Sequence, residues 1–185
     1  MKSGKPLSIL FLALTLVATT TSLADAQPRA EIGASLVSSV IELGDDGVST
    51  LGIPSGGFGI LNPGMYASLF VGTHVAIEPQ VGFHWASFDG ESEHILNFVG
   101  QFDYFVRGTS ERSPYLFATA GVVNVSDADY TPKSVGFGAG YRIPLGDRLT
   151  LRVDGRYTHF TGEFEGDESD VLAFTFSIGG IFGQR

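Results

Sequence analysis

Charged side chains recur at alternate positions in stretches that are otherwise rich in apolar and small residues. The set is Glu31, Glu78, Asp103, Arg107, Arg142, Arg152, Asp154 and Arg156. Charges that share one face of a strand point into one common space, where they are costly unless they pair. Arginine suits this role because its planar guanidinium can bind a carboxylate through two nitrogens. We expect an ion-pair network made of two arginines and three carboxylates: Arg152 and Arg156 with Glu78, Asp103 and Asp154.

The elements that must position these charges are β-strands. Between His74 and Ala86 the odd positions are mostly apolar, whereas the even positions are mostly polar or small. A period of two over this length indicates a strand with one apolar face. Similar stretches predict eight strands, at 29–40, 64–72, 74–86, 93–107, 114–125, 133–143, 148–160 and 170–182. In 64–72 and 114–125 the alternation is too weak to assign the faces.

The predicted connections alternate between short and long. Tight turns are expected at 72–73, 108–113 and 144–147, and longer loops at 41–63, 87–92, 126–132 and 161–169. The long loops hold most of the acidic residues. Short turns at one end and long loops at the other are typical of membrane β-barrels.

The first 26 residues have the pattern of an export signal. Lys2 and Lys5 precede an apolar run over 7–17, and Ala24-Asp25-Ala26 is a suitable cleavage site. We therefore predict a signal peptide over 1–26 and one β-barrel domain over 27–185. The apolar run is shorter than the roughly 20 residues that a membrane-spanning helix needs.

Composition excludes several classes and bears on which face is inside. The net charge of −9 argues against nucleic-acid binding, and the absence of cysteine excludes disulfides and thiolate metal sites.

An apolar face could line a soluble, lipocalin-like carrier or cover a membrane barrel. Eight strands enclose a narrow lumen, which small polar side chains fit better than many aromatic rings. We therefore expect Phe98, Phe137 and Phe174 outside and Arg156 inside.

The predicted barrel domain resembles the outer-membrane protein β-barrel domain family, the small OmpA- and OmpX-like barrels. The matching stretches are the strand around Glu78, Gly136 to Tyr141, Arg152 to Tyr157, and the ending Gly179-Gly180-Ile181-Phe182. The resemblance implies an eight-stranded antiparallel up-and-down transmembrane barrel, monomeric, in a Gram-negative outer membrane with both termini periplasmic. It also implies contact with outer-membrane lipid, lipopolysaccharide and the outer-membrane assembly machinery.

The function expected from this resemblance is structural: stabilising the envelope, or presenting the loop 41–63 to a surface partner. The main alternative is a narrow, porin-like ion channel. In that case the lumen charges, Glu78, Asp103, Arg107, Arg142, Arg152, Asp154 and Arg156, would act as a gate. A soluble carrier is a further alternative.

An enzyme is not expected. Some eight-stranded barrels remove acyl chains from lipid A, using a His-x-Ser pair near the outer end of the penultimate strand. Here His159 is followed by Thr161, and no acid that could orient the histidine follows at a suitable spacing.

The acidic stretches 89–93 and 167–170 lack the full spacing of a calcium loop, so we expect no metal or cofactor.

Overall fold

The computed structural model describes residues 30–43, 49–52, 64–88, 91–109, 112–125, 131–164 and 167–183. The predicted signal peptide lies outside these residues. The strands are β1 (Ala30–Leu43), β2 (Ser49–Gly52), β3 (Met65–Val71), β4 (Val75–Phe88), β5 (Glu91–Phe105), β6 (Ser113–Val125), β7 (Lys133–Leu145), β8 (Leu149–Phe164) and β9 (Asp167–Phe182). In the described part of the chain, no helix has the length and apolar character needed to cross a membrane.

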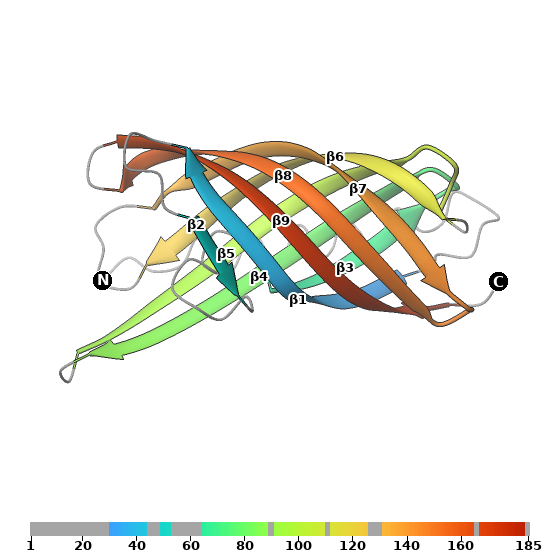
Figure 1. Ribbon diagram of the computed structural model, residues 1–185, viewed down its shortest axis with the longest axis horizontal. Coiled ribbons are helices and arrows are strands. Elements are labelled where there is room, and N and C mark those ends of the chain that lie inside the picture. Colours follow the sequence, from blue (N-terminus) through green and yellow to red (C-terminus); the bar gives the residue numbers. More distant parts are fainter. Residues whose placement is uncertain are drawn as a thin grey trace, which may run out of the picture.

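The strands form one closed antiparallel barrel, and they are inclined to its long axis (Figure 1). From β3 to β9 each strand pairs with the next along the chain, and β1 pairs with both β3 and β9. The β1–β9 register runs from Ala30 opposite Phe182 to Leu43 opposite Asp170. The predicted eight-stranded up-and-down barrel is therefore confirmed, with β1 and β3–β9 as its wall.

The long connections hold more strand than expected. β1 runs to Leu43, and β2 pairs with it from Ser38↔Gly52 to Ile41↔Ser49. The prediction of a loop over 41–63 is therefore wrong for residues 41–43 and 49–52, which are strand. β2 has the sequence Ser-Thr-Leu-Gly, with a single large apolar residue, so it shows no alternation between apolar and polar positions. β4 and β5 continue into the predicted loop 87–92, as do β8 and β9 into 161–169. The β4–β5 hairpin extends beyond its neighbours (Figure 1).

The predicted tight turns gather at one end of the barrel, which we call the turn end. Gly72, Gly108 and Gly146 have φ of 70°, 90° and 72°, a region that glycine adopts without steric cost. These glycines lie between β3 and β4, β5 and β6, and β7 and β8. β1 begins and β9 ends at this same end, because Ala30 is opposite Leu69 on β3 and Gly180 is opposite Leu149 on β8. The opposite end is the loop end.

The apolar face is outside and the polar face inside, as predicted. Phe98, Phe137 and Phe174 are exposed, whereas Arg156 is buried. The exposed apolar set also includes Ile32, Met65, Val71, Phe83, Phe102, Leu116, Val135, Tyr141, Val153 and Phe176. A lipocalin-like carrier would have the reverse arrangement, with its apolar face lining the interior.

Some aromatic rings nevertheless face inward, contrary to the expectation that the lumen holds mainly small polar side chains. The inward rings are Tyr66, Phe70, Phe105, Tyr115, Phe117 and Phe160. Four of them come from β3 and β6, the two stretches whose faces could not be assigned. Glycines on β7 make room for them: Phe117 lies against Gly138 and Tyr115 against Gly140.

Candidate functional site: the polar lumen

Polar side chains fill the lumen together with two buried apolar clusters. Phe70, Ala76, Phe105, Tyr115 and Phe117 form the cluster nearer the turn end. The cluster nearer the loop end consists of Ile95, Val123, Phe160, Val171 and Ala173. Inward positions of β1 and of β3 to β9 all supply polar groups to the lumen.

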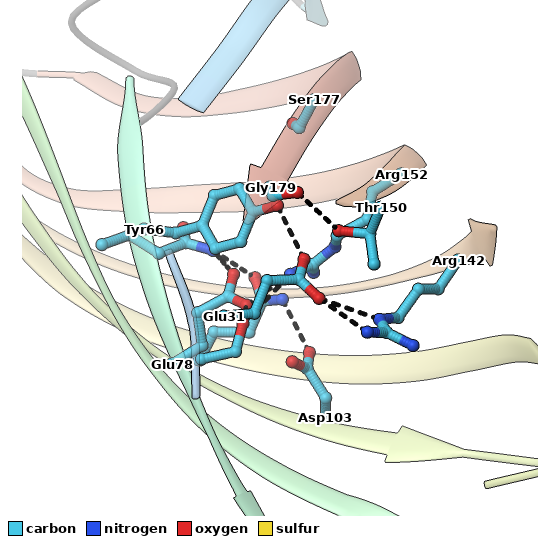
Figure 2. A network of polar contacts seen from close by, with 12 residues as sticks. Glu31, Tyr66, Glu78, Asp103, Arg142, Thr150, Arg152, Ser177 and Gly179 are labelled. Atoms are coloured by element: carbon cyan, nitrogen blue, oxygen red, sulfur yellow. Dashed lines mark hydrogen bonds and ion pairs between the residues drawn. The ribbon is translucent and has the colours of Figure 1, made fainter. Parts of the chain in front are cut away.

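The first ion pair joins β1 to β7. Arg142 donates from Nε and Nη2 to Oε2 of Glu31, at 2.9 and 2.8 Å. The other carboxylate oxygen, Oε1, accepts the hydroxyl of Tyr66 at 2.9 Å. Figure 2 shows the Glu31 carboxylate between these two partners. Both charged side chains are almost fully buried, at 2% and 0% exposure, and the guanidinium of Arg142 lies over Phe70.

The second ion pair joins β8 to β4. Arg152 donates from Nη1 to Oε2 of Glu78, an oxygen that also accepts the hydroxyl of Ser68. The Nε of Arg152 donates to the hydroxyl of Tyr115 at 3.0 Å. Its guanidinium carbon lies 4.7 Å from the ring centre of Tyr66 and 4.9 Å from that of Tyr115, so the cation is held between two aromatic faces.

A ladder of amides extends this pair toward the loop end. Gln80 donates to Oε1 of Glu78 at 2.6 Å and to Oε1 of Gln101 at 2.9 Å. Gln101 in turn donates to Oδ1 of Asp103 at 2.7 Å. Arg156 donates to the side-chain Oε1 atoms of Gln80 and Gln101, at 2.9 and 2.6 Å. Its guanidinium lies over the ring of Phe117. Arg156 is thus bound by neutral amides, and no ion pair of Arg156 is found among the described residues.

Two carboxylate oxygens in this region have no hydrogen-bond partner among the described residues: Oδ2 of Asp103 and Oδ1 of Asp154. A polar cavity of about 20 Å³ is lined by Asp154, Arg156 and Thr175 together with side chains of the network. This volume holds about one water molecule. The lumen is therefore plugged: ion pairs between strands, side-chain amides and aromatic rings occupy the middle of the barrel.

The structure brings some of the predicted site residues together and separates others. Arg152 and Glu78 form an ion pair, and Asp103, Asp154 and Arg156 face the same lumen. Arg142 is in the lumen as well, paired with Glu31. Arg107 was wrongly placed there.

The error at Arg107 has a simple physical cause. β5 ends at Phe105, so the alternation on which the prediction depended has stopped two residues earlier. Arg107 lies in the following turn with its side chain exposed, and its backbone N–H donates to Ser113 Oγ at 2.9 Å.

Several residues of the network were not identified from the sequence. Gln80 and Gln101 share a face with Glu78 and Asp103, so their alternate spacing could have revealed them. Tyr66, Ser68 and Tyr115 could not be found in this way, because β3 and β6 do not alternate clearly.

A second polar cluster lies on the outer surface near the loop end. His159 Nδ1 and Oδ1 of Asp170 are 2.8 Å apart, and the hydroxyl of Tyr157 donates to the same oxygen at 2.8 Å. The expectation that no acid orients His159 is therefore wrong: the β8–β9 register places Asp170 directly opposite it. An acid eleven residues away is adjacent only because the two strands form a hairpin.

The comparisons with known proteins bear on the fold. No family model matches the sequence, and no curated protein matches it. Among solved structures, Neisserial surface protein A (NspA) superposes with a TM-score of 0.55 at 12% identity, over 85% of this chain and 97% of NspA. The fold is that of an outer-membrane β-barrel. At this identity the likeness shows the architecture alone.

Two further outer-membrane proteins match with lower scores. OprG from Pseudomonas aeruginosa has a TM-score of 0.49 at 10% identity, over 86% of this chain and 97% of OprG. Ail, the attachment invasion locus protein of Yersinia pestis, has a TM-score of 0.42 at 14% identity, over 86% of this chain and all of Ail.

Proposed function

We propose that this protein is an integral barrel of a Gram-negative outer membrane with a structural role: stabilising the envelope or presenting its loop end to a partner. In this proposal both ends of the barrel domain are periplasmic, and the barrel is a monomer in contact with lipid and lipopolysaccharide. The observation that carries it is the closed lumen under an apolar outer surface. The buried Arg142–Glu31 and Arg152–Glu78 pairs fill the lumen together with two apolar clusters. The proposal includes no catalytic role.

Envelope fractionation with an unboiled gel tests the location. We expect the protein in the outer-membrane fraction, migrating faster unboiled than boiled because the closed barrel stays compact in detergent. Recovery from the soluble periplasmic fraction without detergent, as a monodisperse species, would contradict the proposal and favour a carrier.

Placing a charge on the outer belt should destabilise the inserted barrel. Phe137 is 64% exposed on β7, and we expect Phe137→Arg to cost about 2–4 kcal/mol in the free energy of unfolding from lipid vesicles. Lys133→Arg, at the end of the same strand, is the matched control and should change little. Equal stability of both variants would argue that this face does not contact hydrocarbon.

A narrow ion channel is the second candidate, and one observation favours it. Asp103 and Asp154 each have a carboxylate oxygen without a hydrogen-bond partner among the described residues, while Arg156 is held by amides. Arg156 could therefore exchange its amide partners for the carboxylate of Asp103 or Asp154. Such an exchange would change the shape of the polar cavity beside Arg156, which is how a gate would open or close a path for ions.

Planar-bilayer recordings distinguish the plug from the channel. We expect no steady conductance from the wild-type barrel, because the ion pairs occupy the lumen. The double variant Glu78→Ser/Arg152→Ser shortens both partners without leaving a lone charge, and it should produce conductance steps. Arg148→Ser, at an exposed turn residue, is the control and should stay silent. Steady wild-type conductance would favour the channel.

A further inference from the structure

The outer surface of β7, β8 and β9 changes character near the loop end. Along β8 the outward positions are apolar or small from Leu149 to Gly155, and Tyr157 follows. Beyond it lies a group of polar side chains that we call the outer-edge patch: Lys133, Tyr157, His159, Thr161 and Asp170. The patch marks the boundary of the apolar belt. Headgroups lie at such a boundary, where tyrosine is also enriched.

The strand register brings the patch together. Lys133 on β7 is directly opposite Thr161 on β8, and His159 on β8 is directly opposite Asp170 on β9. Lys133 and His159 are diagonal neighbours on one face of an antiparallel pair, a spacing of about 7–8 Å that long side chains can bridge. The ammonium and imidazole groups can therefore reach one ligand.

Asp170 orients the imidazole of His159. Its Oδ1 accepts the Tyr157 hydroxyl and pairs with His159 Nδ1. With Nδ1 engaged, Nε2 on the far edge of the ring is the nitrogen available to a ligand. That nitrogen is a donor when the imidazole is protonated.

Lys133 is distinctive in a chain of net charge −9. Only three lysines occur, and the other two are Lys2 and Lys5 in the predicted signal peptide. Among the described residues, the arginines lie in the lumen or in the turns at the turn end. Lys133 is therefore the one described Lys or Arg side chain on the outer surface near the loop end.

We propose that the outer-edge patch binds the phosphate of a phosphorylated glycolipid in the outer leaflet, with the Lys133 ammonium as its cationic partner and the His159 imidazole as a second polar partner. The inference rests on the proposed outer-membrane location, since the loop end then faces the leaflet that contains lipid A. Lys133 supplies a positive charge, the patch lies at the boundary of the apolar belt, and the belt below accommodates the acyl chains.

Native mass spectrometry of the refolded barrel with lipid A tests this, beside the same glycolipid lacking its phosphates. We expect Lys133→Gln/His159→Gln to weaken lipid A binding by about tenfold or more, because it removes charge-assisted hydrogen bonds. Arg112→Gln, an exposed cation at the turn end, is the control and should bind like wild type.

Three results would overturn the inference: equal binding of the phosphate-free glycolipid, no effect of the double variant, or release of an acyl chain from lipid A by the wild type. The last would make the patch a catalytic site. Each sample is first confirmed as folded on an unboiled gel. The outcome therefore stands apart from the fractionation result, which decides the location alone.

Discussion

Arg152→Met should destabilise the barrel by about 3–5 kcal/mol. The substitution leaves Glu78 as a buried carboxylate without its cation, and a lone buried charge costs far more than a pair. It also empties the space between the rings of Tyr66 and Tyr115, where the guanidinium lies. Equilibrium unfolding in urea from lipid vesicles, followed by tryptophan fluorescence, measures the loss.

Two variants make this prediction specific. Arg148→Met removes an exposed arginine at a turn and should cost less than about 0.5 kcal/mol. Glu78→Leu/Arg152→Met replaces both partners by apolar groups and should recover most of the loss, because no buried charge remains. If the double variant is as unstable as Arg152→Met, the loss comes from packing around the arginine and not from the stranded carboxylate.

Gly138→Ala is expected to have the second large effect. A methyl group at Gly138 would collide with the backbone carbonyl oxygen of Gly155 on β8 and with the ring of Phe117. The ring has little room to move because it also packs against Tyr115, and the carbonyl belongs to the barrel wall. Overpacking of this kind costs about 1–3 kcal/mol, which a shift in the urea midpoint would reveal.

Gly100→Ala is the matched control for this variant. Gly100 lies on β5 and points outward, and its added methyl would come no nearer than 3.8 Å to another heavy atom, the Ala120 carbonyl oxygen. The same chemical change should therefore be close to neutral at Gly100. Similar losses at both positions would mean that glycine matters for strand conformation here and not for space.

Much of this fold follows from the sequence because strand geometry is local. The alternation around Glu78 and Arg152 is a property of consecutive residues, so it predicts both the strands and the inward face. The outward rings Phe98, Phe137 and Phe174 follow from the same rule combined with the narrowness of an eight-stranded lumen.

The partners of the site could be predicted only in part, since pairing depends on register across the barrel. Arg142 pairs with Glu31 over a separation of 111 residues, and nothing in the local pattern selects that carboxylate. His159 and Asp170 lie at the ends of two predicted strands, and they meet because the β8–β9 register places them opposite one another. At Arg107 the local pattern itself was misleading, because β5 ends at Phe105 and the alternation does not continue to residue 107.

The β1–β9 seam has a consequence for how the chain reaches this state. The rest of the wall can form from neighbouring segments, but the seam joins Ala30 to Phe182, near the two ends of the described chain. Closing so large a loop is entropically slow, so ring closure should be the last event of folding. A chain shortened before β9 would leave two open edges with unsatisfied amides, which hydrocarbon does not tolerate. Completion of synthesis is therefore a precondition for stable insertion.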